Sequence, residues 1–173
     1  MNYISTFENV LSEELSHQLN ALAATEPHER RTKGEGGFHE WNIARANLAL
    51  AEDIVAVQMK LAFQYIEINQ LSPKMFPEKH TFEQPRLKRY RGDDWFPPHV
   101  DISDRISARR FLAFLFYVQA PEAGGETVWP HQQVTVKPED GACVVFPPLW
   151  PWLHYGSKST GEKLILSGYC QYV

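Results

Sequence analysis

The chain has few cysteines and no long apolar run, and these absences exclude several classes of protein. Cys143 and Cys170 are the only cysteines among 173 residues, too few for a small secreted domain held together by disulfides. Both stand in apolar, strand-like stretches, which favours buried free thiols. No stretch reaches the length that spans a bilayer, and the first residues lack the basic and then apolar pattern of a secretory signal. We therefore expect a cytoplasmic protein with no membrane partner.

The chain also lacks a strong charge of either sign. Its formal net charge is -4, with 43% hydrophobic and 22% charged residues, which is typical of a soluble globular domain. A bulk positive charge that would attract nucleic acid is absent, so no nucleic-acid partner is expected. Basic residues gather within 86–91 and 105–110, where a solvated strand edge or loop is the simplest explanation. The length suits a single domain over 1–173.

The first part of the chain is predicted to be helical. Ser12 precedes two glutamates and then leucines at helical spacing, which is typical of a helix start. A second helix is predicted from position 44 to about 68, where neither Pro nor Gly interrupts an apolar face. Between them, the glycine-rich stretch 33–37 is expected to form a flexible loop. These features predict a helical support over about 1–80.

From about position 82 the pattern changes to short β-prone runs separated by Pro and Gly. The runs cover 86–90, 96–102, 110–119, 126–129, 133–136, 142–146 and 163–173. Strands at this spacing predict a sandwich or a double-sheet jelly roll. The run 110–119 is apolar on both faces and should therefore be a central strand. The expected fold class is α+β, with the N-terminal helices packed on one sheet and a catalytic β core over about 82–173.

Three residues suggest a metal site in this β core. His99 and Asp101 stand two apart in an expected strand, so their side chains should point the same way. His154 precedes the last strand and could complete one face of a metal ion. Two histidines and one carboxylate are the ligands of non-haem Fe(II) oxygenases, and they leave coordination positions open. With seven histidines in the chain, a single His-x-Asp motif arises readily by chance, so its surroundings decide its meaning.

Lys163 is the most informative of those surroundings. It opens the last strand, where a period of two puts Lys163, Ile165 and Ser167 on one face. A buried ammonium needs an anionic partner, and a small dicarboxylate would supply one; a solvated lysine on an edge strand is the alternative. Tyr90 and Tyr117 carry hydroxyl groups on strands that are expected to line the same cavity.

Together these residues resemble the prolyl 4-hydroxylase-like branch of the Fe(II)- and 2-oxoglutarate-dependent dioxygenases. The resemblance runs in order across about 84–173, from Tyr90 through His99-Val100-Asp101 and Gly124-Gly125-Glu126-Thr127 to His154 and Lys163. It implies a double-stranded β-helix, which is a cupin-like jelly roll. It also implies a hydroxylase of C–H bonds, with a prolyl residue in a peptide or protein as the favoured substrate. The implied cofactors are Fe(II), 2-oxoglutarate and O2, with ascorbate as a further candidate.

The resemblance assigns roles to single residues. His99, Asp101 and His154 would bind iron, and no other catalytic residue is implied. Because related halogenases lack the carboxylate ligand, Asp101 favours hydroxylation over halogenation. Lys163 would pair with the distal carboxylate of 2-oxoglutarate. The residues implied to bind or line the cosubstrate site are Tyr90, Tyr117, Thr127, Lys163 and Ser167.

Four further residues are candidates for substrate contacts, namely Trp95, Arg105, Trp150 and Trp152. The first two flank the expected entrance, and the last two could stack on a peptide or a proline ring, although packing explains them equally well. Several other functions stay open: hydroxylation of a free amino acid or other small molecule, oxidative demethylation, and a catalytically silent metal-binding β-sandwich or structural zinc module. A structural zinc site normally has a fourth protein ligand, so the intact triad with Lys163 argues against the silent module. The oligomeric state is not indicated by the sequence.

Overall fold

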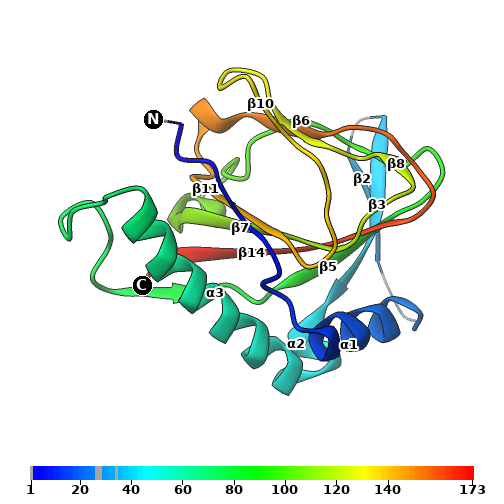
Figure 1. The fold of residues 1–173 in the computed structure, drawn as a ribbon, viewed down its shortest axis with the longest axis horizontal. Helices are drawn as coiled ribbons and strands as arrows, with labels where there is room; N and C mark the ends of the chain where they lie inside the picture. Colours follow the sequence, from blue (N-terminus) through cyan, green and yellow to red (C-terminus); the bar gives the residue numbers. More distant parts are fainter. Residues whose placement is uncertain (1, 26–28, 34) are drawn as a thin grey trace.

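The structure is a computed structural model that describes residues 2–25, 29–33 and 35–173 (Figure 1). Its helices are α1 (Glu13–Ala23), α2 (Ile43–Ala46) and α3 (Leu48–Ile68), with 3-10 turns η1 (Ser107–Arg109) and η2 (Trp150–Trp152). Its strands are β1 (Ser5–Phe7), β2 (Glu29–Lys33), β3 (Gly36–Asn42), β4 (His80–Phe82), β5 (Arg86–Tyr90), β6 (Phe96–His99), β7 (Arg110–Gln119), β8 (Ala123–Gly124), β9 (Thr127–Trp129), β10 (Val134–Val136), β11 (Cys143–Phe146), β12 (His154–Gly156), β13 (Ser159–Thr160) and β14 (Lys163–Tyr172). In the described residues, no helix has both the length and the apolar character needed to cross a membrane.

Two antiparallel sheets form the body of the protein. The larger has eight strands in the order β1-β11-β7-β14-β5-β3-β2, with β4 paired to β14, and the smaller has the order β10-β9-β12-β6. Buried residues from both sheets, including Tyr117, Trp129 and Ile165, pack in one cluster between them. This arrangement confirms the predicted double-sheet jelly roll. Strand β7 lies between β11 and β14, so the prediction of a central strand at 110–119 is also confirmed.

The three helices lie together along the other face of the larger sheet (Figure 1). Leu19 of α1 and Ile54 and Leu61 of α3 pack with Phe116 and Leu166 in a second buried cluster. Burial of apolar area on this scale is the main force that holds the helices to the sheet. The expected α+β class, with the helices on one sheet, is therefore confirmed.

The start of α1 follows the prediction, whereas the second helix does not. The Ser12 side chain accepts a hydrogen bond from the Leu15 backbone N–H at 3.2 Å, as a helix cap should. The expected helix from 44 to 68 is broken at Asn47, whose backbone is extended and whose side chain accepts from the Leu50 N–H at 3.1 Å. Asparagine competes with the backbone in this way, so α3 begins with a new cap and the prediction of one continuous helix was wrong.

The stretch 33–37 is not the flexible loop that was expected. Lys33 ends β2 and Gly36 begins β3, and the two strands form an antiparallel hairpin that pairs with β5; Gly34 itself lies outside the described residues. A Cβ atom on Gly36 would meet the Trp95 carbonyl oxygen at 2.4 Å, so this glycine allows close backbone approach. The region 1–80 therefore supplies strands as well as the helical support.

Candidate metal and cosubstrate site

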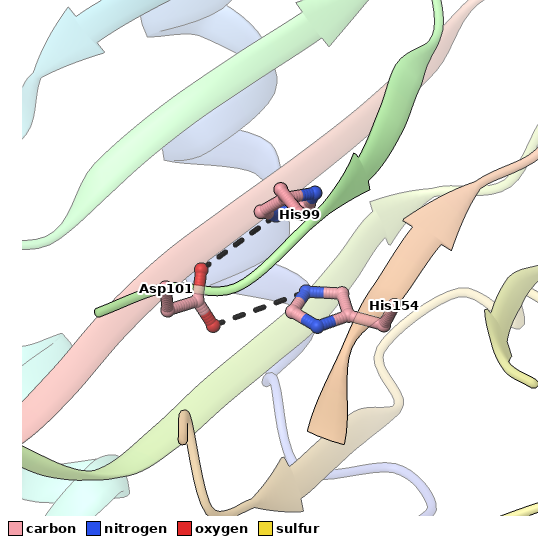
Figure 2. A group of neighbouring side chains, drawn as sticks. All are labelled: His99, Asp101 and His154. Atoms are coloured by element: carbon pink, nitrogen blue, oxygen red, sulfur yellow. Dashed lines mark ion pairs between the residues drawn. The ribbon is translucent and has the colours of Figure 1, made fainter. Parts of the chain in front are cut away.

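The three candidate metal ligands meet at one end of the space between the sheets. His99 ends β6 and His154 begins β12, and the two are direct partners across the smaller sheet. His99 Nε2 lies 3.7 Å from Asp101 Oδ1, and His154 Nε2 lies 3.8 Å from Asp101 Oδ2 (Figure 2). One donor atom from each residue falls within 4.8 Å of the other two, which is close enough for a single ion to bind all three.

The backbone orients both imidazoles in the same way. His99 Nδ1 lies 2.9 Å from the Pro97 carbonyl oxygen, and His154 Nδ1 lies 3.0 Å from the Trp152 carbonyl oxygen. A carbonyl only accepts, so each Nδ1 carries the proton and each Nε2 keeps a lone pair for a metal. Burial, followed by the neighbouring His154, lowers the pKa of His99 to about 4. The imidazole is therefore neutral near pH 7, as metal binding requires.

Asp101 lies beyond the end of its strand. The expected strand 96–102 stops at His99, and Asp101 follows in a bend, so strand geometry alone does not aim its carboxylate. Tyr169 donates its hydroxyl to Asp101 Oδ1 at 2.9 Å. Burial alone would raise the pKa of Asp101, but His154, His99 and Lys88 outweigh it and the pKa is lowered. The carboxylate is thus anionic at neutral pH.

This set of donors fits an Fe(II) ion that keeps open positions. Two imidazoles and one carboxylate match the 2-His-1-carboxylate triad in donor type. In the part of the chain that the structure describes, no fourth His, Cys, Asp or Glu joins the group. A structural zinc site would normally be closed by such a residue.

A pocket extends from the triad between the sheets to Lys163. Its lining residues are Lys88, Tyr90, Asp94, Trp95, Phe96, His99, Asp101, Ala113, Phe114, Leu115, Thr127, Phe146, His154, Gly156, Ser157, Ser159, Lys163, Ile165, Ser167 and Tyr169. Lys163 is 5% exposed, and its Nζ donates to the Gly125 carbonyl oxygen at 2.5 Å. Burial lowers the pKa of Lys163 to about 8, although Glu126 acts in the opposite direction. The lysine is buried inside the protein, as the strand pattern indicated, and not solvated at an edge.

The other candidate cosubstrate residues line this pocket or contact its lining. The Tyr90 hydroxyl is buried and has no hydrogen-bond partner among the described residues. Tyr117 donates its hydroxyl to Thr127 Oγ1 at 2.8 Å; Thr127 lines the pocket and Tyr117 stands behind it. The Lys163 Nζ lies 5.7 Å from the ring centres of both tyrosines. Ser167 lines the same pocket from β14, so four of the five candidates line it, and Tyr117 contacts the lining through Thr127.

Only one of the four candidate substrate residues reaches the pocket. Trp95 lines it, whereas Arg105 is exposed in the loop after Asp101. Trp150 is 79% exposed and lies outside the lining. Trp152 donates its indole N–H to the Asn2 carbonyl oxygen at 2.8 Å and packs edge-on against Tyr3. The structure thus gives Trp152 a packing contact with the N-terminal segment.

Sequence reasoning missed two polar residues that face the triad. Lys88 lines the pocket, and its Nζ lies 5.1 Å and 5.4 Å from the ring centres of Phe38 and Phe96. Tyr169 contacts Asp101 directly, and burial raises the pKa of its phenol well above the ordinary value. A period of two along the strands would have found both, because Lys88 stands two residues from Tyr90 and Tyr169 stands two residues from Ser167.

Several solved structures share this fold. A viral collagen prolyl hydroxylase from Paramecium bursaria Chlorella virus 1, solved with 2-oxoglutarate, is 21% identical with a TM-score of 0.68, over 99% of this chain and 97% of that one. A Pseudomonas putida prolyl-4-hydroxylase is 18% identical with a TM-score of 0.77, over 100% and 94%. The non-haem α-ketoglutarate-dependent epimerase SnoN from nogalamycin biosynthesis is 14% identical with a TM-score of 0.70, over 99% and 78%. At these identities the likeness establishes the fold, a double-stranded β-helix.

No sequence in the curated set of proteins matches the chain. Residues 85–171 match the sequence pattern of the 2OG-Fe(II) oxygenase superfamily, and this stretch is half of the 173 residues. It contains all three candidate ligands and Lys163. The chain therefore belongs to the 2OG-Fe(II) oxygenase superfamily and is a dioxygenase with Fe(II), 2-oxoglutarate and O2 as its cofactors.

Proposed function

We propose that this dioxygenase hydroxylates a C–H bond of a prolyl residue in a peptide or protein. His99, Asp101 and His154 would hold Fe(II), and Lys163 would bind 2-oxoglutarate. The observation that carries the proposal is one continuous pocket with the metal-ligand triad at one end and a buried lysine at the other. Bound iron would couple oxidative decarboxylation of 2-oxoglutarate to succinate with insertion of oxygen into the C–H bond.

The residues around Lys163 are suited to a dicarboxylate. A buried ammonium is costly without an anion, and the distal carboxylate of 2-oxoglutarate would form a charge-assisted pair with it. The buried Tyr90 hydroxyl would donate a second hydrogen bond to the cosubstrate, and Thr127 and Ser167 would line its path. In this proposal the aromatic walls keep water out, and the protein's own part is to bind, orient and shield the reactants.

The preference for a peptide rests on the outer side of the triad and on the neighbours. A groove of about 630 Å³ runs past His99 and Asp101, bordered by the loop residues Ser103 and Ile106. Such a groove can take an extended segment as well as a small molecule. Two of the similar structures are prolyl hydroxylases, which favours a prolyl substrate. The epimerase from nogalamycin biosynthesis shares the fold, so a free amino acid or other small molecule is the second candidate.

The first experiment measures succinate formation from 2-oxoglutarate with Fe(II) and O2. We expect His99→Ala to reduce it to the metal-free background, because a metal ligand is lost. His131→Ala, at an exposed histidine, is the matched control and should behave as wild type. Equal succinate formation by His99→Ala and wild type would contradict the metal assignment.

The substrate class is tested separately by mass spectrometry. Proline-containing peptides, free proline and other amino acids are incubated with the loaded enzyme, and the expected result is a gain of one oxygen atom on a prolyl residue of a peptide. A gain on a free amino acid alone would replace the peptide proposal with the small-molecule one. A protein that makes no succinate with any of them, although it binds iron and 2-oxoglutarate, would fit the catalytically silent alternative.

A further inference from the structure

We infer that Tyr169, Arg110 and Glu83 form a clamp that fixes the Asp101 carboxylate for metal binding. The inference rests on the proposed role of Asp101 as a metal ligand. The three residues are positioning residues, because each acts through Asp101 and none is itself a metal ligand. None of them belongs to the candidate ligand set or to the residues proposed to bind 2-oxoglutarate.

Asp101 needs such a clamp more than either histidine does. His99 and His154 belong to paired strands, and each ring is held by a carbonyl two residues earlier in the chain. Asp101 lies in a bend after β6 ends, where no strand ladder fixes its direction. Its carboxylate must therefore be oriented by residues that are distant in sequence.

The clamp is a closed ring of contacts around Asp101. The Tyr169 hydroxyl donates to Asp101 Oδ1 at 2.9 Å. The Arg110 guanidinium carbon lies 3.9 Å from the centre of the Tyr169 ring, and Arg110 Nη1 donates to the Asp101 carbonyl oxygen at 2.8 Å. One phenol thus holds the side chain, and one guanidinium holds the backbone of the same residue.

Glu83 completes the ring and holds Arg110 in place. Arg110 Nε and Nη2 each donate to a different Glu83 carboxylate oxygen at 2.8 Å, which is the bidentate geometry that fixes a guanidinium most firmly. The Glu83 backbone N–H donates to the Tyr169 carbonyl oxygen at 2.9 Å. Arg110 and Glu83 side chains are each 21% exposed, so water competes only partly with this pair.

The clamp also affects how the carboxylate can bind a metal. The Tyr169 hydroxyl occupies a lone pair of Oδ1, which favours coordination through the other oxygen, Oδ2. Coordination through one oxygen keeps positions on the metal free for 2-oxoglutarate and O2. Hydrogen-bond partners behind metal ligands typically change metal affinity by about 10–100-fold when they are removed.

The test is a cobalt(II) titration, followed through the visible absorption of the bound ion. Tyr169→Phe keeps the ring beneath Arg110 and removes only the hydroxyl, and we expect its cobalt dissociation constant to rise about 10–100-fold. Tyr172→Phe makes the same change at a half-exposed position on the same strand and should match wild type. Glu83→Gln loosens Arg110 without touching Tyr169 and should weaken cobalt binding by a smaller factor.

A double-mutant cycle with Asp101→Ala separates positioning from a general effect on folding. If Tyr169 acts through the carboxylate, Tyr169→Phe changes cobalt affinity in the wild type and adds nothing in Asp101→Ala. Equal cobalt affinity of Tyr169→Phe and wild type would overturn the inference, and so would an undiminished effect in Asp101→Ala. The titration needs no turnover, so its outcome is independent of the succinate assay for the proposed function.

Discussion

The two faces of strand β14 are equally buried, but one carries polar groups and the other is apolar. Lys163, Ile165 and Ser167 line the pocket between the sheets, whereas Leu164 and Leu166 belong to the core beneath the helices. All five are at most 5% exposed. A cation on the pocket face gives up solvation that its hydrogen bond to the Gly125 carbonyl oxygen replaces only in part, because no anion among the described residues pairs with it there. The core face contributes stability, and the pocket face holds the chemistry.

The largest effect on stability is expected from a substitution on the core face of β14. Leu166 is fully buried and is the Cα partner of both Leu87 and Phe116 in neighbouring strands. Leu166→Ala removes these contacts and leaves a cavity, so we expect the free energy of unfolding to fall by about 2–5 kcal/mol. The binding of 2-oxoglutarate to the protein that remains folded should stay as in wild type. Chemical denaturation and a binding titration measure the two quantities, and a loss of affinity without a loss of stability would contradict the division.

A change on the pocket face should have the reverse effect. Lys163→Met keeps most of the length of the side chain and removes the charge that is proposed to pair with 2-oxoglutarate. A charge-assisted hydrogen bond contributes about 1.5–3 kcal/mol, so we expect the dissociation constant for 2-oxoglutarate to rise by at least tenfold. Stability without ligand should not fall, because burial disfavours the ammonium. Calorimetric titration measures the affinity for 2-oxoglutarate. An unchanged dissociation constant would contradict the proposed role of Lys163 in binding it.

Long, strongly patterned segments were the predictable part of this fold. The apolar run 110–119 and the run that starts at Lys163 form central strands because most residues of each run are buried. The short strands β1, β4, β8, β12 and β13 were missed, since stretches of two or three residues become strands only through pairing partners elsewhere in the chain. The hairpin of β2 and β3 was missed for another reason, because the glycines within 33–37 favour a loop.

The candidate site also has a part that the sequence predicts and a part that it does not. His99 and His154 stand on paired strands that bring them together, and the period of two along β14 puts Lys163 on the same face as Ser167, toward the pocket. Asp101 does lie beside the two histidines, but the predicted strand geometry does not place it there, because the strand ends before it and contacts from Tyr169 and Arg110 hold it. Such contacts between distant segments leave little trace in one sequence. The position of an exposed tryptophan such as Trp150 relative to a pocket cannot be predicted from sequence spacing either, since it depends on the tertiary structure.

The pH dependence of 2-oxoglutarate binding distinguishes a buried lysine from an ordinary one, with an expected effect near pH 8 that is smaller than that of removing the charge. The pKa of Lys163 is lowered to about 8, so without ligand the ammonium is complete below that pH and is lost above it. 2-Oxoglutarate needs the charged form, and its binding should therefore be independent of pH below about 8 and weaken roughly tenfold per pH unit above it, or about 1.4 kcal/mol per unit. Titrations from pH 7 to about 9.5 would measure this slope; a flat profile would mean that the lysine titrates normally. Lys163→Arg keeps its charge throughout this range, so any decline that it shares with wild type has a cause other than Lys163. Only the difference between the two profiles reports the buried ammonium.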